Sequence, residues 1–201
     1  MDKILYTISG RDKCYKFLQF LEKFLTSSNE NNPQNETLFW IIKQINHSIG
    51  LARHINKFGG TIEYIQKLKQ ILKTKMIFCL SLNELFSICS DILNILDTLV
   101  DHLIFLCKIN VINNNQLLFL NRLSGIIWFL NISKVFGTNI KKYYINNTLT
   151  IKEKCKIIQC IFDYIVLLNY TLEEHLIPRW LFGILGMLSC ALSVYTKYLL
   201  K

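Results

Sequence analysis

The stretch GRDKCYKFLQFLEKFL, residues 10–25, decides the fold, because its apolar residues recur every three or four positions. With an advance of about 100° per residue, these apolar residues fall on one face of a helix. The apolar face consists of Cys14, Phe17, Leu18, Leu21, Phe24 and Leu25. The opposite face consists of Asp12, Lys16, Gln19 and Lys23. Ser9, followed three residues later by Asp12, resembles a capping box, so we expect an amphipathic helix that begins near Gly10.

The same helical pattern extends over nearly the whole chain, which has only two prolines and eight glycines. We expect further helices over about residues 38–58, 62–78, 83–108, 116–136 and from 151 to just before 178. Polar stretches at 26–37 and 137–150 are typical of a linker and a loop. The expected fold class is all-α: a membrane-associated bundle of amphipathic helices with a C-terminal hydrophobic membrane segment.

A single domain over residues 1–201 is expected, because this length is enough for one domain with its own core. Its parts are basic amphipathic helices (1–80), an amphipathic acidic-striped helix with a hydrophobic helix (81–137), a polar loop and helix (138–177) and the C-terminal membrane segment (178–201).

The composition is both apolar and basic. Hydrophobic residues make up 51% of the chain, the mean hydropathy is +0.29 and the formal net charge is +9. Residues 1–80 hold twelve Lys and Arg against six Asp and Glu, whereas residues 81–201 hold eleven against eight. This combination favours an anionic membrane surface as the partner. Nucleic acid, the other common partner of basic proteins, is disfavoured because the surplus charge is dispersed over many apolar helices.

The C-terminal stretch LFGILGMLSCALSVYTKYLL, residues 181–200, is long and apolar enough for a membrane segment. Arg179 and Trp180 stand just before it, as interfacial anchors do. Gly183, Gly186 and Ser189 give it a face of small residues, at which another helix can approach closely. We expect this face to take part in self-association.

Residues 83–108 also look like a membrane span, but they contain Asp91, Asp97 and Asp101. Each Asp at the centre of a span costs about 2.5–3.5 kcal/mol, far more than one Leu or Ile gains. All three fall on one polar stripe of the helix. We therefore expect this helix to pack in a bundle, against basic helices, rather than cross lipid alone.

Residues 62–78, with a lead-in from Arg53, are predicted to be the membrane-bending element. Polar residues occupy one arc of this helix and apolar residues the facing side. Five lysines from Lys57 to Lys75 accompany one acid, Glu63, and each lysine near an anionic surface adds about 1 kcal/mol. The predicted lipid-binding residues are Arg53, Lys57, Phe58, Ile62, Ile65, Lys67, Leu68, Lys69, Ile71, Leu72, Lys73 and Lys75. Periodicity also fits a core-facing helix of a bundle, since both arrangements bury one stripe.

The sequence holds no motif of a catalytic, cofactor or metal site, such as a phosphate-binding loop or H-E-x-x-H. Its seven cysteines include no C-x-x-C and read as reduced core thiols. His47 and His54 lie seven positions apart, wider than the spacing of helical metal sites. We therefore expect no enzyme, no cofactor and no metal.

Three blocks of the chain together resemble the peroxin-eleven family. TISGRDKCYKFLQF, residues 7–20, is similar to the family's N-terminal motif and contains Gly10, Arg11, Asp12 and Lys13. HSIGLARHINKFGGTIEYIQKL, residues 47–68, is similar to its second motif, with Arg53, Lys57, Phe58 and Gly59. PRWLFGILGMLSCALSVY, residues 178–195, is similar to the C-terminal segment. Gly60 departs from the pattern, since relatives more often have a basic or polar residue there.

The resemblance implies a peroxisomal or glycosomal membrane protein that elongates the organelle membrane before fission. It also implies self-association, insertion of an amphipathic helix into one leaflet, an N-terminal region (1–80) facing the cytosol and contact with the fission machinery. Two alternatives from other classes stay open. One is a pore or carrier for small metabolites, in which the stripe of Asp91, Asp97 and Asp101 lines a water-filled path. The other is a non-catalytic helical interaction module.

Overall fold

The computed structural model describes most of the chain and shows it to be helical. The described residues are 7–27, 36–57, 62, 65, 66, 69, 70, 82–171 and 177–199. Every regular element in this part of the chain is a helix, and none is a strand. The all-α prediction is therefore confirmed.

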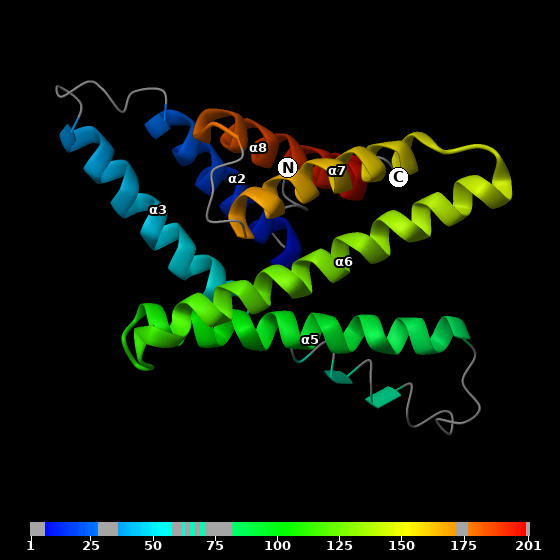
Figure 1. The fold of residues 1–201 in the computed structure, drawn as a ribbon, viewed down its shortest axis with the longest axis horizontal. Helices are drawn as coiled ribbons and strands as arrows, with labels where there is room; N and C mark the ends of the chain where they lie inside the picture. Colours follow the sequence, from blue (N-terminus) through cyan, green and yellow to red (C-terminus); the bar gives the residue numbers. More distant parts are fainter. Residues whose placement is uncertain are drawn as a thin grey trace. The chain divides into compact units, whose positions relative to one another are not determined.

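The helices follow one another as drawn in Figure 1. Their bounds are α2 Ile8–Ser27, α3 Glu36–Lys57, α5 Leu82–Lys108, the 3-10 turn η3 Asn114–Gln116, α6 Leu117–Asn146, α7 Ile151–Thr171, α8 Arg179–Val194 and the π-helical turn η4 Tyr195–Leu199. Two compact units are formed, one by Met1–Arg53 with Ile132–Lys201 and one by His54–Asn131.

In the first unit, α8 packs against α2 and against α7 (Figure 1). The buried apolar residues of this unit are Ile132, Cys160, Val166, Leu167, Phe182 and Cys190. Burial raises the pKa of the Cys160 thiol to about 11, so this cysteine stays protonated and unreactive at neutral pH. The cysteines of the described residues are all free, although Cys89 is exposed rather than buried.

In the second unit, α5 and the first part of α6 form a helical pair. The turn between them contains Asn110 in the left-handed region, with φ of 60°, followed by η3. Asparagine tolerates this conformation better than most residues. The core between the two helices consists of Val100, Ile104, Cys107, Leu120 and Ile127. The predicted helix over 83–108 is confirmed, within a residue of its expected start.

Two helix boundaries differ from the sequence expectation. The cap of α2 is Thr7 instead of Ser9: the Thr7 hydroxyl accepts from the Gly10 amide at 3.0 Å, and the helix begins at Ile8. The helix α6 runs through Gly137 and ends at Asn146, so residues 137–146 are no loop. One glycine costs a helix about 1 kcal/mol, which the helical turns on both sides outweigh.

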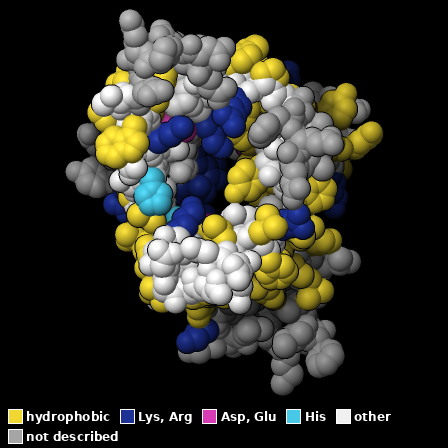
Figure 2. Space-filling model, turned by 60° about the vertical axis from the view of Figure 1, so that its left-hand side comes forward, with side chains coloured by type: hydrophobic (Ala, Val, Ile, Leu, Met, Phe, Trp, Pro, Cys, Tyr) yellow, Lys and Arg dark blue, Asp and Glu magenta, His cyan; other side chains and the backbone are white. Residues whose placement is uncertain are grey.

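Large apolar side chains remain exposed on helices of both units. Those on α3 and α5 include Leu38, Trp40, Ile41, Ile45, Leu85, Phe86, Ile92, Leu96, Leu99 and Leu103. On the face drawn in Figure 2, hydrophobic side chains lie open among lysines and arginines, and carboxylates are barely visible. Apolar exposure on this scale is typical of a protein that contacts a membrane or another protein.

Candidate membrane-binding site

One helical stretch in the described residues, Arg179–Tyr198, is long and apolar enough to span a bilayer by length and composition. It comprises α8 and most of η4, and it agrees with the segment predicted from the sequence. The residues described here bury only 33% of this apolar stretch. Most residues of this stretch are therefore at least partly exposed in the part of the chain that the structure describes.

The small-residue face of α8 is the surface against which α2 packs. A Cβ added at Gly183 would lie 2.8 Å from both the Cβ and the backbone nitrogen of Phe24. A Cβ added at Gly186 would run into the ring of Phe20. Only glycine allows the two backbones to come this close. We expected this face to bind a second copy of the chain, and in the structure α2 of the same chain occupies it.

Polar and aromatic contacts fasten α2 to the two ends of this apolar stretch. At one end the hydroxyls of Thr7 and Tyr198 are hydrogen bonded at 2.5 Å. At the other end the Lys23 ammonium lies 4.5 Å from the ring centroid of Phe182, which packs edge-on against Phe20. Burial is the main cause that lowers the pKa of Lys23, although Glu22 opposes the shift. The helical wheel had placed Lys23 on the polar face, so this contact was missed from the sequence.

The side of α8 that faces α7 carries a buried polar contact. The Ser189 hydroxyl donates to the Asp163 carboxylate at 2.5 Å. The Gln159 amide also donates to Asp163, at 3.3 Å. A charged acceptor makes such hydrogen bonds stronger than neutral ones, so this contact fixes the rotation of α8 against α7.

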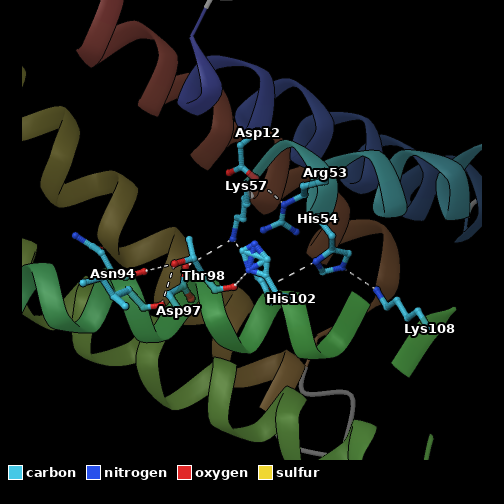
Figure 3. Close-up of polar contacts among 11 residues, drawn as sticks. Asp12, Arg53, His54, Lys57, Asn94, Asp97, Thr98, His102 and Lys108 are labelled. Atoms are coloured by element: carbon cyan, nitrogen blue, oxygen red, sulfur yellow. Dashed lines mark hydrogen bonds and ion pairs between the residues drawn. The ribbon is translucent and has the colours of Figure 1, made fainter. Parts of the chain in front are cut away.

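The first two motif blocks are joined to each other by an ion pair. The Arg53 Nε donates to the Asp12 carboxylate at 2.7 Å, and both side chains are largely shielded from solvent (Figure 3). A second contact links the same helices, α2 and α3: the Asn46 amide donates to Glu22 at 2.9 Å. Burial is the main cause that raises the pKa of Glu22. Within the first motif Gly10 is buried and Arg11 is exposed.

In the second unit, Lys57 is bound by the acidic stripe of α5. Its ammonium donates to the Asp101 carboxylate. The same ammonium lies 3.6 Å from the Asp97 carboxylate (Figure 3). Only 9% of the Asp101 side chain is exposed. The prediction that the acidic stripe packs against basic residues holds for this pair. Lys57, like Arg53, had been predicted to bind lipid, and in the structure a carboxylate of the chain itself already holds each of them.

Two histidines border this ion pair. The Lys108 ammonium lies 3.2 Å from Nε2 of His54, and Nδ1 of the same ring lies 3.9 Å from the Asp101 carboxylate. His102 donates from Nδ1 to the Thr98 carbonyl at 2.5 Å. Burial is the main cause that lowers the pKa of His102, with Asp101 opposing the shift and Lys57 adding to it. Neither histidine belongs to a group of three or more ligands that could hold a metal among the described residues.

The predicted lipid-binding segment is only partly covered by the described residues. Ile62, Ile65 and Lys69 are helical and exposed, as are Gln66 and Gln70. The remaining predicted residues lie outside the described part of the chain: Phe58, Gly59, Lys67, Leu68, Ile71, Leu72, Lys73 and Lys75.

Comparison with known proteins identifies the family. The family model described as peroxisomal biogenesis factor 11 (PEX11) matches residues 2–156. The match includes the first two motif blocks and ends within α7, so the C-terminal block lies beyond it. Neither the curated proteins nor the solved structures contain a match. The match covers more than half of the chain and confirms the resemblance seen in the sequence: this chain belongs to the peroxisomal biogenesis factor 11 family of peroxisomal membrane proteins.

Proposed function

We propose that the chain elongates and remodels the peroxisomal or glycosomal membrane, and so promotes proliferation and fission of the organelle. The bending element is the amphipathic helix over residues 62–78, which inserts its apolar stripe into the cytosolic leaflet. The observation that carries this proposal is the exposure of Ile62 (58%) and Ile65 (41%), one helical turn apart. Exposed isoleucines at this spacing form one apolar edge, with Gln66 and Gln70 exposed beside them.

Charge supports the same assignment. Lys67, Lys69, Lys73 and Lys75 accompany the apolar stripe, and each adds about 1 kcal/mol near anionic lipid. Arg53 and Lys57 act differently in this proposal. Because carboxylates of the chain hold them, they anchor the end of α3 and so position the segment that follows, instead of binding headgroups.

Family membership supports the cellular setting of the proposal. The N-terminal region faces the cytosol, where the anionic leaflet and the organelle fission machinery are within reach. The chain acts with copies of itself and without catalysis. The glycine face of α8 becomes available to a second copy only when α2 leaves it, since α2 covers Gly183 and Gly186.

The pore alternative gains no support from the acidic stripe. A charged path for solutes needs carboxylates that face water. Asp101 is buried and bound to Lys57, and Asp97 lies close to the same ammonium. Two of the three stripe carboxylates are therefore neutralised within the protein.

The test uses the full chain with Ile62→Glu and Ile65→Glu. The matched control is Gln66→Glu with Gln70→Glu, which adds the same two charges to polar residues of the same helical turns. We expect the first variant to reach the organelle but to lose both organelle elongation and the tubulation of anionic vesicles. The control should retain most of both. Normal elongation by the isoleucine variant would show that this helix does not bend the membrane.

A further inference from the structure

The contact between α2 and α8 conflicts with a bilayer around α8. Arg179–Tyr198 spans about 30 Å as a helix, which is the thickness of the hydrocarbon core. Thr7 contacts Tyr198 near one end of this stretch, and Lys23 contacts Phe182 near the other. The two helices are therefore antiparallel, and α2 lies along nearly the full length of the apolar stretch (Figure 1).

The helix α2 cannot accompany α8 into lipid. Between its two end contacts it carries Asp12, Lys13 and Lys16, and Lys23 lies at the end itself. At the depth set by this antiparallel pairing, Asp12, Lys13 and Lys16 would lie in the hydrocarbon core. Each charge near the centre of a span costs about 2.5–3.5 kcal/mol. A bilayer around α8 is therefore incompatible with α2 on its glycine face.

We propose that α2 is a removable cover for α8, and that α8 enters the bilayer only after α2 has left Gly183 and Gly186. The inference rests on the proposed membrane function and adds a closed state to it. In the closed state α2 fills the glycine face and limits the apolar surface of α8. In the open state the same face is free for lipid or for a second copy of the chain.

An anionic membrane surface supplies a reason for α2 to leave. Arg11 is exposed, and Lys13 and Lys16 are half-buried, so the basic residues of α2 are partly open to headgroups. Phe17, Leu18 and Leu25 are exposed on the same helix and can enter the interface once it is released. The lipid that binds α2 thereby removes it from α8.

A disulfide between the two helices tests the proposal in the full chain. The added Cβ at Gly183 lies 2.8 Å from both the Cβ and the backbone nitrogen of Phe24. A disulfide needs about 3.5–4.5 Å between the two Cβ atoms, so Phe24→Cys can be linked to Gly183→Cys when the two helix backbones move apart by about 1 Å. Each single variant, oxidised in the same way, controls for the native cysteines. The sample is added to vesicles containing phosphatidylserine, and the fraction that resists alkaline carbonate is measured before and after reduction.

We expect the fraction of protein that resists alkaline carbonate to be at least tenfold smaller in the linked form than in the reduced form. Equal resistance with the link intact on a non-reducing gel would overturn the proposal. Vesicle tubulation in the reduced sample tests the proposed function separately from the proposal that α2 covers α8. Tubulation without carbonate resistance overturns the cover but leaves the proposed function standing, whereas loss of tubulation overturns the proposed function.

A second pair of variants keeps the test decisive if the linked protein does not fold. Phe20→Ala removes the ring that lies over Gly186, and should speed insertion into the same vesicles at least threefold. Phe119→Ala makes the same change at an exposed position of α6, outside α2, and should leave the insertion rate unchanged. Equal insertion rates for the two variants would contradict a cover that rests on the Phe20 contact.

Discussion

One helix contact in each unit shows a different means of holding two helices together. In the first unit α2 and α8 meet where Gly183 and Gly186 lack side chains, so the contact depends on volume. In the second unit the end of α3 meets α5 through Lys57 and Asp101, so that contact depends on charge. Lipid chains can replace a helix in a contact that depends on close packing, because they can fill the same space. A buried ion pair has no such substitute, because lipid offers no fixed counter-charge at that depth.

Breaking the ion pair should have the largest effect on stability. Asp101→Asn removes the nearer carboxylate from the buried Lys57 ammonium and leaves the more distant Asp97, and removal of one partner of a buried pair costs about 3–5 kcal/mol. Urea unfolding in detergent measures the loss. Lys57→Met combined with Asp101→Leu should recover most of it, because neither charge of the Lys57–Asp101 pair is then left without the other. A loss below about 1 kcal/mol in the single variant would mean that water reaches this pair.

Filling the glycine face should have an intermediate effect. Gly186→Ala places a methyl group where the Phe20 ring lies, and overpacking of this kind costs about 1–3 kcal/mol. Gly137→Ala is the matched control, since nothing lies within 4 Å of its added Cβ. This control should be neutral or more stable by up to about 1 kcal/mol, because alanine favours the helix. The same unfolding assay compares them, and equal midpoints would exclude a volume-limited contact.

Protonation of His102 in the second unit at low pH should have the smallest effect on the free energy of unfolding. Because burial lowers the pKa of His102 in the folded state, the unfolded chain takes up a proton more readily. The free energy of unfolding should therefore fall as the pH drops below about 6.5, and level off below the folded pKa. His102→Gln should flatten this part of the pH profile. If this variant keeps the same pH dependence of the free energy of unfolding, a group other than His102 causes the loss of stability at low pH.

Periodicity predicted most of the helices but few of their partners. The helix over 83–108 was within a residue of its observed start because its stripe of acids is regular and uninterrupted. The predicted end of α6 near residue 136 was wrong, because a single glycine such as Gly137 only weakly disfavours a long helix. The cap of α2 was misplaced by two residues, since Thr7 and Ser9 offer the same hydroxyl chemistry.

The candidate site was harder to predict than the fold. The helical wheel of residues 10–25 places Lys23 on the polar face, so it could not place Lys23 over Phe182, a residue 159 positions away. The sequence predicts that Arg53 and Lys57 bind lipid, and it does not show that carboxylates on other helices hold both of them. The small residues of α8 did indicate a close helix contact. Which helix makes that contact depends on tertiary packing, which the local pattern does not contain.

The ion pair between Asp12 and Arg53 bears on how this chain is recognised at all. The two residues stand 41 positions apart in the two motifs that carry the family resemblance, yet they form one contact. A change at either position would leave the other charge largely shielded from solvent without this ion pair. The two short motifs are therefore separate in the sequence but form one contact between α2 and α3 in the fold.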